Sequence, residues 1–239
     1  MKMLIGLPDL SGNEPALRFA EGVAELIEAD TTILHDISAR GILREAESGA
    51  YGLLAVRWTG MPRLDRIAKQ VVAGAKVSVL VIKGEPVSLA RLLICTGGRP
   101  VAKPIIRTGA RLAQAASAEV TLLHVASPVP SMYTGLRAME EGIGDLLKRD
   151  TLEAQHLREG AQILADHDVG AVLELRHGVV VDEIIRSTQS WDYDLIVVGA
   201  SESASRLNRL FFGGVTQKIL ELAPCSVLVE RRGVHGEVL

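Results

Sequence analysis

Short apolar runs rich in Val, Ile and Leu alternate along this chain with longer segments in which apolar residues recur every three or four positions. The short runs predict strands, and the longer segments predict amphipathic helices. Alternation of the two is typical of βαβ units around a parallel sheet. Runs that are apolar throughout are typical of strands covered on both faces. The pattern therefore predicts an α/β fold with open parallel sheets.

The second half of the chain carries this pattern most clearly. Strands are predicted over 92–96, 120–125, 172–175, 195–198 and 227–230. Helices are predicted over 102–116, 142–166, 181–189 and 216–221. The charged run from Arg137 to Arg158 belongs, on this interpretation, to one amphipathic cover helix with a solvated face.

The first half is a shortened copy of the second. Arg18, Thr32, Leu34 and His35 match Arg107, Thr121, Leu123 and His124 at a constant offset of 89 residues, Tyr51–Val56 matches Tyr193–Val198 at an offset of 142, and Ser78–Val81 matches Ser226–Val229 at an offset of 148. Each increase in offset marks a deletion in the first half, of 53 and then six residues. A period of this kind indicates a tandem repeat.

Two open-sheet domains follow from the repeat. A reduced domain of about four strands is expected over residues 1–86, and a complete five-stranded domain over 88–232. The stretch Gly84–Ser88 is a linker too short to let the two drift far apart. Residues 233–239 are expected to form a flexible tail.

The last strand of each predicted domain is apolar. Residues 77–82 and 227–230 would be open sheet edges if each domain stood alone, with unpaired N–H and C=O groups. We therefore expect the two strands to pair, so that the halves form an intrachain pseudo-dimer.

Composition and charge exclude several classes of function. The 239 residues include 26 Lys and Arg against 29 Asp and Glu, for a net charge of -3, and only 3% are aromatic. Neither a phosphate backbone nor stacked bases are therefore expected as partners. No apolar run approaches the roughly 20 residues that span a bilayer, and the first residues lack the pattern of an export signal. We expect a cytoplasmic protein with no nucleic-acid or membrane partner.

Candidate chemistry lies where the strand order of an open parallel sheet reverses, outside the carboxyl ends of the strands. In the second half, the residues there are Thr96 and Gly97 after the first strand, and Gly199 and Ser201 after the fourth. Before the last helix stand Gly213, Gly214, Val215 and Thr216. Glycine N–H groups, a helix N-terminus and a threonine hydroxyl can together bind a phosphate group. The Gly213-Gly214 pair is equally compatible with a tight turn before a helix.

The second half resembles a universal stress protein domain of the UspA type. The segments that carry the resemblance are Arg91–Thr96, Ala118–Val125, His177-Gly178, Asp194–Gly199, Gly213–Thr216 and Leu222–Val229. It covers essentially all of 88–232 and, more weakly, 1–86. It implies a fold like that of adenine-nucleotide α-hydrolases, frequent dimerisation through the last strand, and a role in stress adaptation. It also implies ATP or AMP as the ligand of the residues named above, together with Val125.

The chain departs from the motif of the family's ATP-binding members. These members carry an Asp after the first strand, where this chain has Gly97, and the second glycine of their phosphate loop falls on Glu202. Gly214 replaces the expected Ser or Thr, although Thr216 is kept. A carboxylate about 4 Å from a phosphate is repelled by about 1 kcal/mol in water and by more when desolvated. The resemblance therefore implies weak ATP or AMP binding at most.

The first half departs in another way. Asp9 is close to the family's Asp position, but the deletion after Val56 removes the glycine loop. Asp9 then has no phosphate cradle beside it. The segment instead predicts a helix start at Glu14-Pro15, capped by Ser11 or Asn13.

Three functions stay open on the sequence. The first is a non-catalytic stress-response protein with a degenerate nucleotide pocket, and a homodimer is possible. The second is a nucleotide-binding protein that hydrolyses ATP slowly, and the third is a scaffold independent of nucleotide. No catalytic residue is assigned, and His156 and His167 lack the third ligand of a metal site. Cys95 and Cys225 fit no metal or disulfide spacing, so we expect reduced core thiols.

Overall fold

The computed structural model describes residues 1–7, 12–35, 38–97, 102–126, 143–200 and 214–231, and within them nine strands form one continuous sheet. The strand order is β2-β1-β3-β4-β9-β8-β5-β6-β7. The strands are β1 (Lys2–Gly6), β2 (Asp30–Leu34), β3 (Leu53–Trp58), β4 (Ser78–Lys83), β5 (Arg91–Thr96), β6 (Glu119–Ala126), β7 (Ala171–His177), β8 (Leu195–Gly199) and β9 (Ser226–Glu230). Neighbouring strands are parallel except β4 and β9. The predicted α/β fold with a mainly parallel sheet is confirmed.

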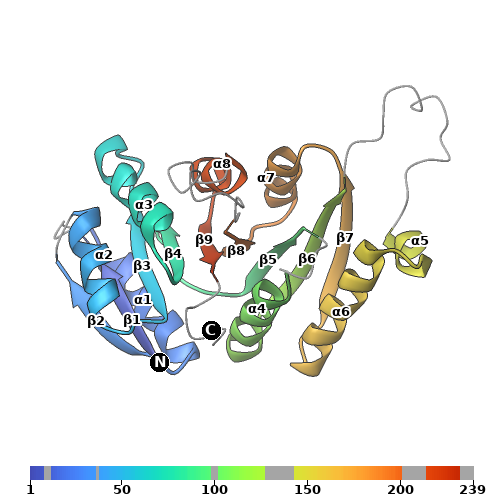
Figure 1. Ribbon diagram of the computed structural model, residues 1–239, viewed down its shortest axis with the longest axis horizontal. Helices are drawn as coiled ribbons and strands as arrows, with labels where there is room; N and C mark the ends of the chain where they lie inside the picture. The colour runs from blue at the N-terminus through green and yellow to red at the C-terminus, as the bar shows by residue number, and fades with distance from the viewer. Residues whose placement is uncertain (8–11, 36–37, 98–101, 127–142, 201–213, 232–239) are drawn as a thin grey trace.

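Helices cover both faces of this sheet (Figure 1). The helices are α1 (Glu14–Leu26), α2 (Ala39–Ser48), α3 (Pro62–Gly74), α4 (Ala102–Ala116), α5 (Ile143–Lys148), α6 (Leu152–Asp166), α7 (Val180–Ser190) and α8 (Gly214–Leu222). Buried side chains of α1, α4 and α6 form one apolar cluster with the sheet, and those of α2, α3, α7 and α8 form another on the opposite face. All described side chains of β4 and β9 are buried, because these central strands are covered on both sides.

The prediction of one long helix over 142–166 is wrong. The structure has two helices there, α5 and α6, and α6 begins after Thr151. The Thr151 backbone is extended, and its Oγ1 accepts a hydrogen bond from the Ala154 N–H at 3.2 Å. This side chain satisfies a free N–H of the new helix, as Ser and Thr do at N-caps. The guanidinium of Arg158 donates to the Leu147 and Arg149 carbonyls and so holds the break in place.

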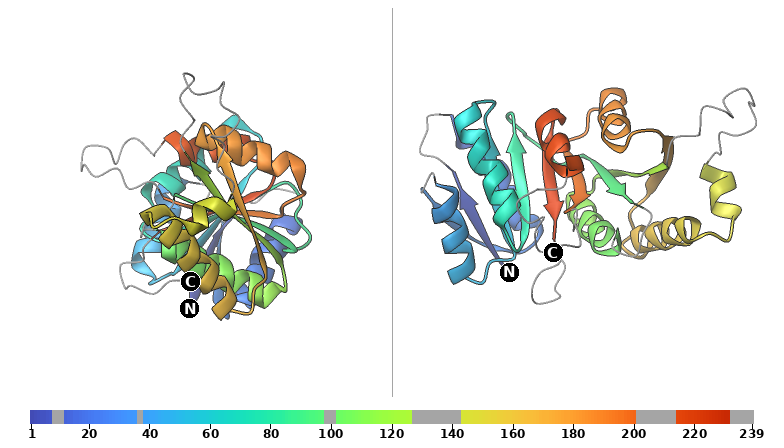
Figure 2. Two further views of the ribbon diagram at one scale, coloured as in Figure 1. Left: turned by 90° about the vertical axis from the view of Figure 1, so that its right-hand side faces the viewer. Right: turned by 45° about the horizontal axis from the view of Figure 1, so that its top comes forward.

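The antiparallel pair β4·β9 joins the two parts of the sheet (Figure 2, right). Leu80 pairs with Leu228. These two residues are equivalent in the sequence repeat, in which the last strands are related by an offset of 148. The Ser226 hydroxyl accepts a hydrogen bond from the Lys83 N–H at 3.2 Å, and the Ser78 hydroxyl accepts one from the Arg231 N–H at 3.0 Å. The strands that were expected to pair are therefore neighbours, with equivalent contacts at the two ends.

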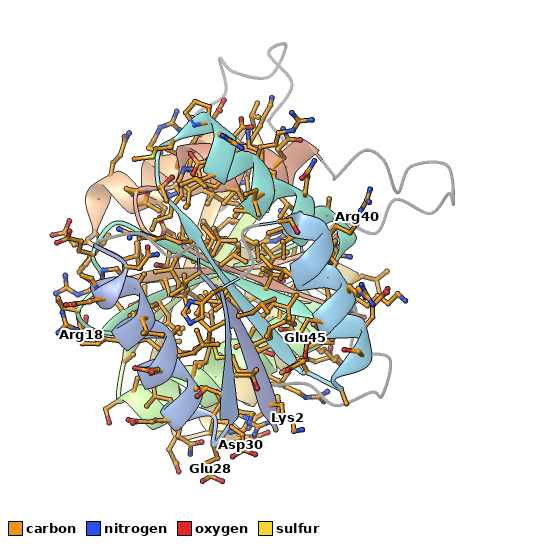
Figure 3. All side chains as sticks on the ribbon, turned by 90° about the vertical axis from the view of Figure 1, so that its left-hand side faces the viewer. Lys2, Arg18, Glu28, Asp30, Arg40 and Glu45 are labelled. Carbon is orange, nitrogen blue, oxygen red and sulfur yellow. The ribbon has the colours of Figure 1, made fainter. Side chains whose placement is uncertain are left out.

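Strand β2 forms one outer edge of the sheet, as Figure 3 shows from that side. Lys2 of β1 pairs in register with Asp30 of β2, and the two side chains lie together at the lower end of this view. Opposite charges on directly paired residues stabilise a sheet modestly. No helix in the described part of the chain is long and apolar enough to cross a membrane.

Candidate functional site

The strand order reverses between β5 and β8. From β5 the chain moves outward through β6 to β7, and it then returns to the other side of β5 as β8 and β9. The parallel register pairs Ile94 with Val197, so Thr96 and Gly199, two residues further along each strand, end at the same level. In an open α/β sheet a ligand binds outside the carboxyl ends at such a reversal. The structure therefore brings these two predicted residues to the edge where a binding site is expected.

The residues predicted after β5 and β6 differ in exposure. The side chain of Thr96 is buried, Val125 is partly buried, and Gly97 is exposed. Among the described residues, none has an atom within 4 Å of a Cβ added to Gly97. The end of β5 thus carries a glycine at the position where the sequence resemblance implies a carboxylate. Ser201 and Gly213 lie outside the described residues, as do Asp9, Ser11, Glu202 and the predicted tail 233–239.

Helix α8 begins at Gly214 and presents its first residues at this edge. Gly214 is exposed and Val215 is 41% exposed, so the first two residues of the helix are not buried in the core. Thr216 is only 2% exposed, and its Oγ1 points to the Gly199 carbonyl oxygen at 3.4 Å. The hydroxyl that was predicted to bind a phosphate therefore links the start of α8 to the end of β8. It faces the sheet and not the solvent.

Gly199 packs against Ile105 of α4. A Cβ atom at Gly199 would lie 2.6 Å from Cδ1 and 3.4 Å from Cγ1 of Ile105. Cδ1 ends a flexible side chain and can move aside for one methyl group, but a larger side chain would force the helix and strand apart. Close packing inside the fold therefore explains the lack of a side chain at position 199, without any need for a ligand.

His124 lies beside these residues and was not predicted as part of the site. Its side chain is buried at the end of β6, and its Nδ1 is 3.1 Å from the Thr96 carbonyl oxygen. This contact satisfies a polar group of a histidine that is buried in the core. The position of His124 at the end of a predicted strand next to Thr96 was the only signal that could have placed it here. The contact between His124 and the Thr96 carbonyl oxygen holds the backbone directly before Gly97.

The equivalent edge of the first half holds an arginine. The repeat maps Gly199 onto Arg57 and Ile105 onto Ala16. The strand therefore carries the large side chain in the first half, and the helix carries it in the second half. Nη1 of Arg57 donates to the Gly12 carbonyl oxygen at 2.6 Å and to Oδ1 of Asn13. Arg57 thereby occupies the start of α1.

The helix starts at Glu14 with Asn13 at the N-cap position, as predicted, but the predicted hydrogen bond from an Asn13 side-chain cap is not present. Asn13 has helical dihedral angles and makes no capping hydrogen bond with its side chain. The reason is that its Oδ1 accepts a hydrogen bond from the Arg57 guanidinium, which competes with the N–H groups of the first turn. A charged donor forms the stronger hydrogen bond.

Other polar groups are engaged within the fold. Glu183, which is buried, contacts both Arg186 and Arg176, while Glu174 accepts from Arg176 and from the Ser187 hydroxyl. These residues join β7 to α7 and lie away from the reversal between β5 and β8. The described residues contain no cluster of three or more His, Cys, Asp or Glu side chains that would suit a metal ion.

The two cysteines are free and partly buried. Burial raises the pKa of the Cys95 thiol far above its usual range and that of Cys225 to about 12, although the Lys83 ammonium opposes the rise at Cys225. Both are therefore protonated at neutral pH and poorly nucleophilic. Neither takes part in the candidate site.

Comparisons with known proteins match this chain to one protein family. Residues 89–231 match the model of the universal stress protein family. A universal stress protein of Methanocaldococcus jannaschii is 27% identical over 142 residues, which are 59% of this chain and 82% of that protein. One from Thermus aquaticus is 31% identical over 140 residues, 59% of this chain and 97% of that protein.

The similarity in fold extends over both halves. The crystal structure of a universal stress protein from Archaeoglobus fulgidus matches 97% of this chain and 88% of its own, with a TM-score of 0.63 and 15% identity. At this identity the likeness concerns the fold, and it includes residues that the family model does not cover.

Proposed function

This chain belongs to the universal stress protein family, and we propose that it acts as a non-catalytic stress-response protein whose adenine-nucleotide pocket, at the β5–β8 edge, is degenerate. The observation that carries the proposal is the end of β5. Gly97 stands there, exposed and without a carboxylate, beside a strand end whose geometry suits a ligand. ATP or AMP is therefore expected to bind weakly or not at all.

The surroundings of Thr216 support weak binding. Its hydroxyl points to Gly199 and is buried, so a phosphate would have to compete with an existing intramolecular contact. The start of α8, whose first two residues are exposed, still favours an anion through the positive end of the helix dipole. A site with these groups and no nucleoside carboxylate would bind phosphate without holding the rest of a nucleotide firmly.

Restoring the missing acid tests this proposal. We expect Gly97→Asp to bind ATP at least about tenfold more tightly than the wild type, which corresponds to about 1.4 kcal/mol. Gly97→Asn is the matched control, since it adds a similar side chain without charge. Equal ATP affinity for Gly97→Asp and the wild type would contradict the idea that the absent carboxylate weakens the pocket.

We further propose that the chain is a tandem protein, with a reduced unit over 1–86 and a complete unit over 88–232 that form an intrachain pseudo-dimer. The pairing of Leu80 with Leu228 and the equivalent serine contacts at the two ends of β4·β9 support it. A contact between equivalent surfaces has this two-fold form. Since β4 covers the edge of β9, a homodimer would have to use another surface. Sedimentation is expected to give the 25.6 kDa mass of one chain, and a dimer that assembles through β9 would contradict the proposal.

A further inference from the structure

Two polar groups break the equivalence of the two halves next to the β4·β9 pair. The repeat maps Ile82 onto Glu230 and Phe19 onto Thr108. Ile82 and Phe19 belong to one apolar cluster, whereas the equivalent place in the second half holds a carboxyl and a hydroxyl group. Buried polar groups cost free energy unless they are hydrogen-bonded, so this place requires an explanation.

The Glu230 carboxyl is almost completely enclosed. The residue is 4% exposed, its Oε2 accepts a hydrogen bond from the Ser78 hydroxyl of β4 at 2.9 Å, and it forms no ion pair with a described residue. Thr108 of α4 also faces the carboxyl, and its Oγ1 is fully buried without a hydrogen bond of good geometry. The Thr108 hydroxyl can accept from a protonated carboxyl group or donate to an ionised one, so it does not by itself favour either form.

Among the described residues, no charged group is a partner that compensates an ionised Glu230. From β4 the facing group is the Ser78 hydroxyl, from α4 it is the Thr108 hydroxyl, and from β8 it is the backbone at Gly199 and Ala200. Arg107 and Arg111 of α4 are exposed, and the adjacent Arg231 directs its Nη2 to the Val72 carbonyl oxygen. Burial raises the pKa of Glu230 to about 7, although the two hydroxyl groups act in the opposite direction.

Glu230 also connects the β4·β9 pair, which we call the seam between the two halves, to the candidate site. Its carbonyl oxygen accepts a hydrogen bond from the Ala200 N–H at 2.9 Å, and Glu230 pairs in register with Gly199. A change at Glu230 therefore acts both on the β4·β9 pair and on the strand end that carries the binding edge.

We propose that Glu230 is a proton-sensitive latch, which holds the β4·β9 seam and the end of β8 while its carboxyl is protonated and loosens them when the proton is released to water. The proposal does not require a nucleotide to bind.

The sign of the pH effect follows from linkage. In the unfolded chain Glu230 ionises around its usual value of 4.5, while in the folded chain it keeps its proton to about pH 7. As the pH rises between these values, ionisation favours the unfolded state, so stability is present below pH 4.5 and is lost by the time the pH passes 7. The folding equilibrium constant is expected to fall by about a hundredfold from this group alone.

Denaturant unfolding between pH 4.5 and pH 8 tests the latch. The ratio of the wild-type folding constant to that of Glu230→Gln, which cannot ionise, should fall by about a hundredfold over this range. Glu221→Gln is the control, because the carboxyl of Glu221 lies at the same seam, bonds to Lys69 and has a lowered pKa. The ratio for that control should not fall as the pH rises. A constant ratio for Glu230→Gln would overturn the proposal.

Two further measurements locate the effect. Amide hydrogen exchange at Leu80, Leu228 and Ala200, corrected for the intrinsic pH dependence, should accelerate between pH 6 and pH 8 in the wild type and not in Glu230→Gln. If Glu230→Gln does not fold, the carboxyl carbon of Glu230 can be titrated by NMR in the wild type. A midpoint near 7 supports the latch, and a midpoint near 4.5 overturns it.

Discussion

The ammonium group of Lys83, at the end of β4, donates a hydrogen bond to the carbonyl oxygen of Ala223 at 2.6 Å. Ala223 directly follows α8, so the last residue of one strand caps the final turn of a helix from the other half of the chain. Nη2 of Arg231 makes the equivalent contact in the opposite direction, to the Val72 carbonyl oxygen in the last turn of α3 at 2.7 Å. Cations are favoured at helix C-termini. The seam is thus held by two reciprocal caps as well as by the strand pair.

Removing the Lys83 cap should destabilise the fold. Lys83 is 8% exposed, and its Nζ lies 5.0 Å from the centre of the Trp58 ring. Lys83→Met keeps the length of the side chain but leaves the Ala223 carbonyl without this donor. We expect a loss of about 1–3 kcal/mol in the free energy of unfolding, measured by denaturant titration. Lys76→Met, at an exposed lysine paired with Glu47, should change it by less than about 1 kcal/mol. Equal effects would mean that the cap contributes nothing.

The serine at the start of β9 gives a second test of the seam. Ser226 is 1% exposed, and its hydroxyl accepts from the Lys83 N–H. Ser226→Ala leaves this buried N–H without an acceptor and should cost about 1–3 kcal/mol of stability. Ser190→Ala, which removes an exposed hydroxyl from α7, serves as the control and should be close to neutral. A neutral Ser226→Ala would contradict the importance of this contact.

The sequence predicted most of the fold because its signals are local. Continuous apolar runs such as Val77–Ile82 can be satisfied only by strands covered on both faces, and the repeat offsets placed β4 and β9 in equivalent roles. The break between α5 and α6 was missed because it depends on one threonine whose side chain binds its own helix. The charge periodicity on both sides of Thr151 continues and hides the break.

The site was harder to predict because it depends on side-chain directions. The sequence named the Thr216 hydroxyl as a candidate donor to a phosphate, but it could not reveal that the hydroxyl points to Gly199. It also assigned the cap of the first helix to Ser11 or Asn13, and it could not reveal the competing donor for Asn13, Arg57, which lies 44 residues away. Contacts between residues so far apart are set by the packed sheet and leave no pattern along the chain.

Packing at Gly199 can be tested with a double-mutant cycle. Gly199→Val would drive a branched side chain into Ile105 and should cost about 1–3 kcal/mol of stability. Ile105→Ala opens that space, and the double variant should lose less stability than the sum of the two single variants, by about 0.5–3 kcal/mol. The control is Gly97→Ala, where the added Cβ meets no atom of the described part of the chain within 4 Å. Strict additivity in the cycle would show that the two residues do not share this space.

The thiols should be nearly inert in the native protein. Because burial raises the pKa of Cys225 to about 12 and that of Cys95 further, few thiolates exist at pH 8. Reaction with an aromatic disulfide reagent is expected to be about a hundredfold or more slower than in denaturant. Equal rates in the two conditions would show that these thiols are not protected.

Calorimetric titration of the wild-type protein with ATP is the most direct measurement of a degenerate pocket at the carboxyl ends of β5 and β8. We expect no measurable heat, or a dissociation constant above about 100 μM, which corresponds to less than about 5.5 kcal/mol of binding free energy. A dissociation constant in the micromolar range or tighter would contradict this expectation, because the residues at this edge would then hold a nucleotide without the carboxylate that Gly97 lacks.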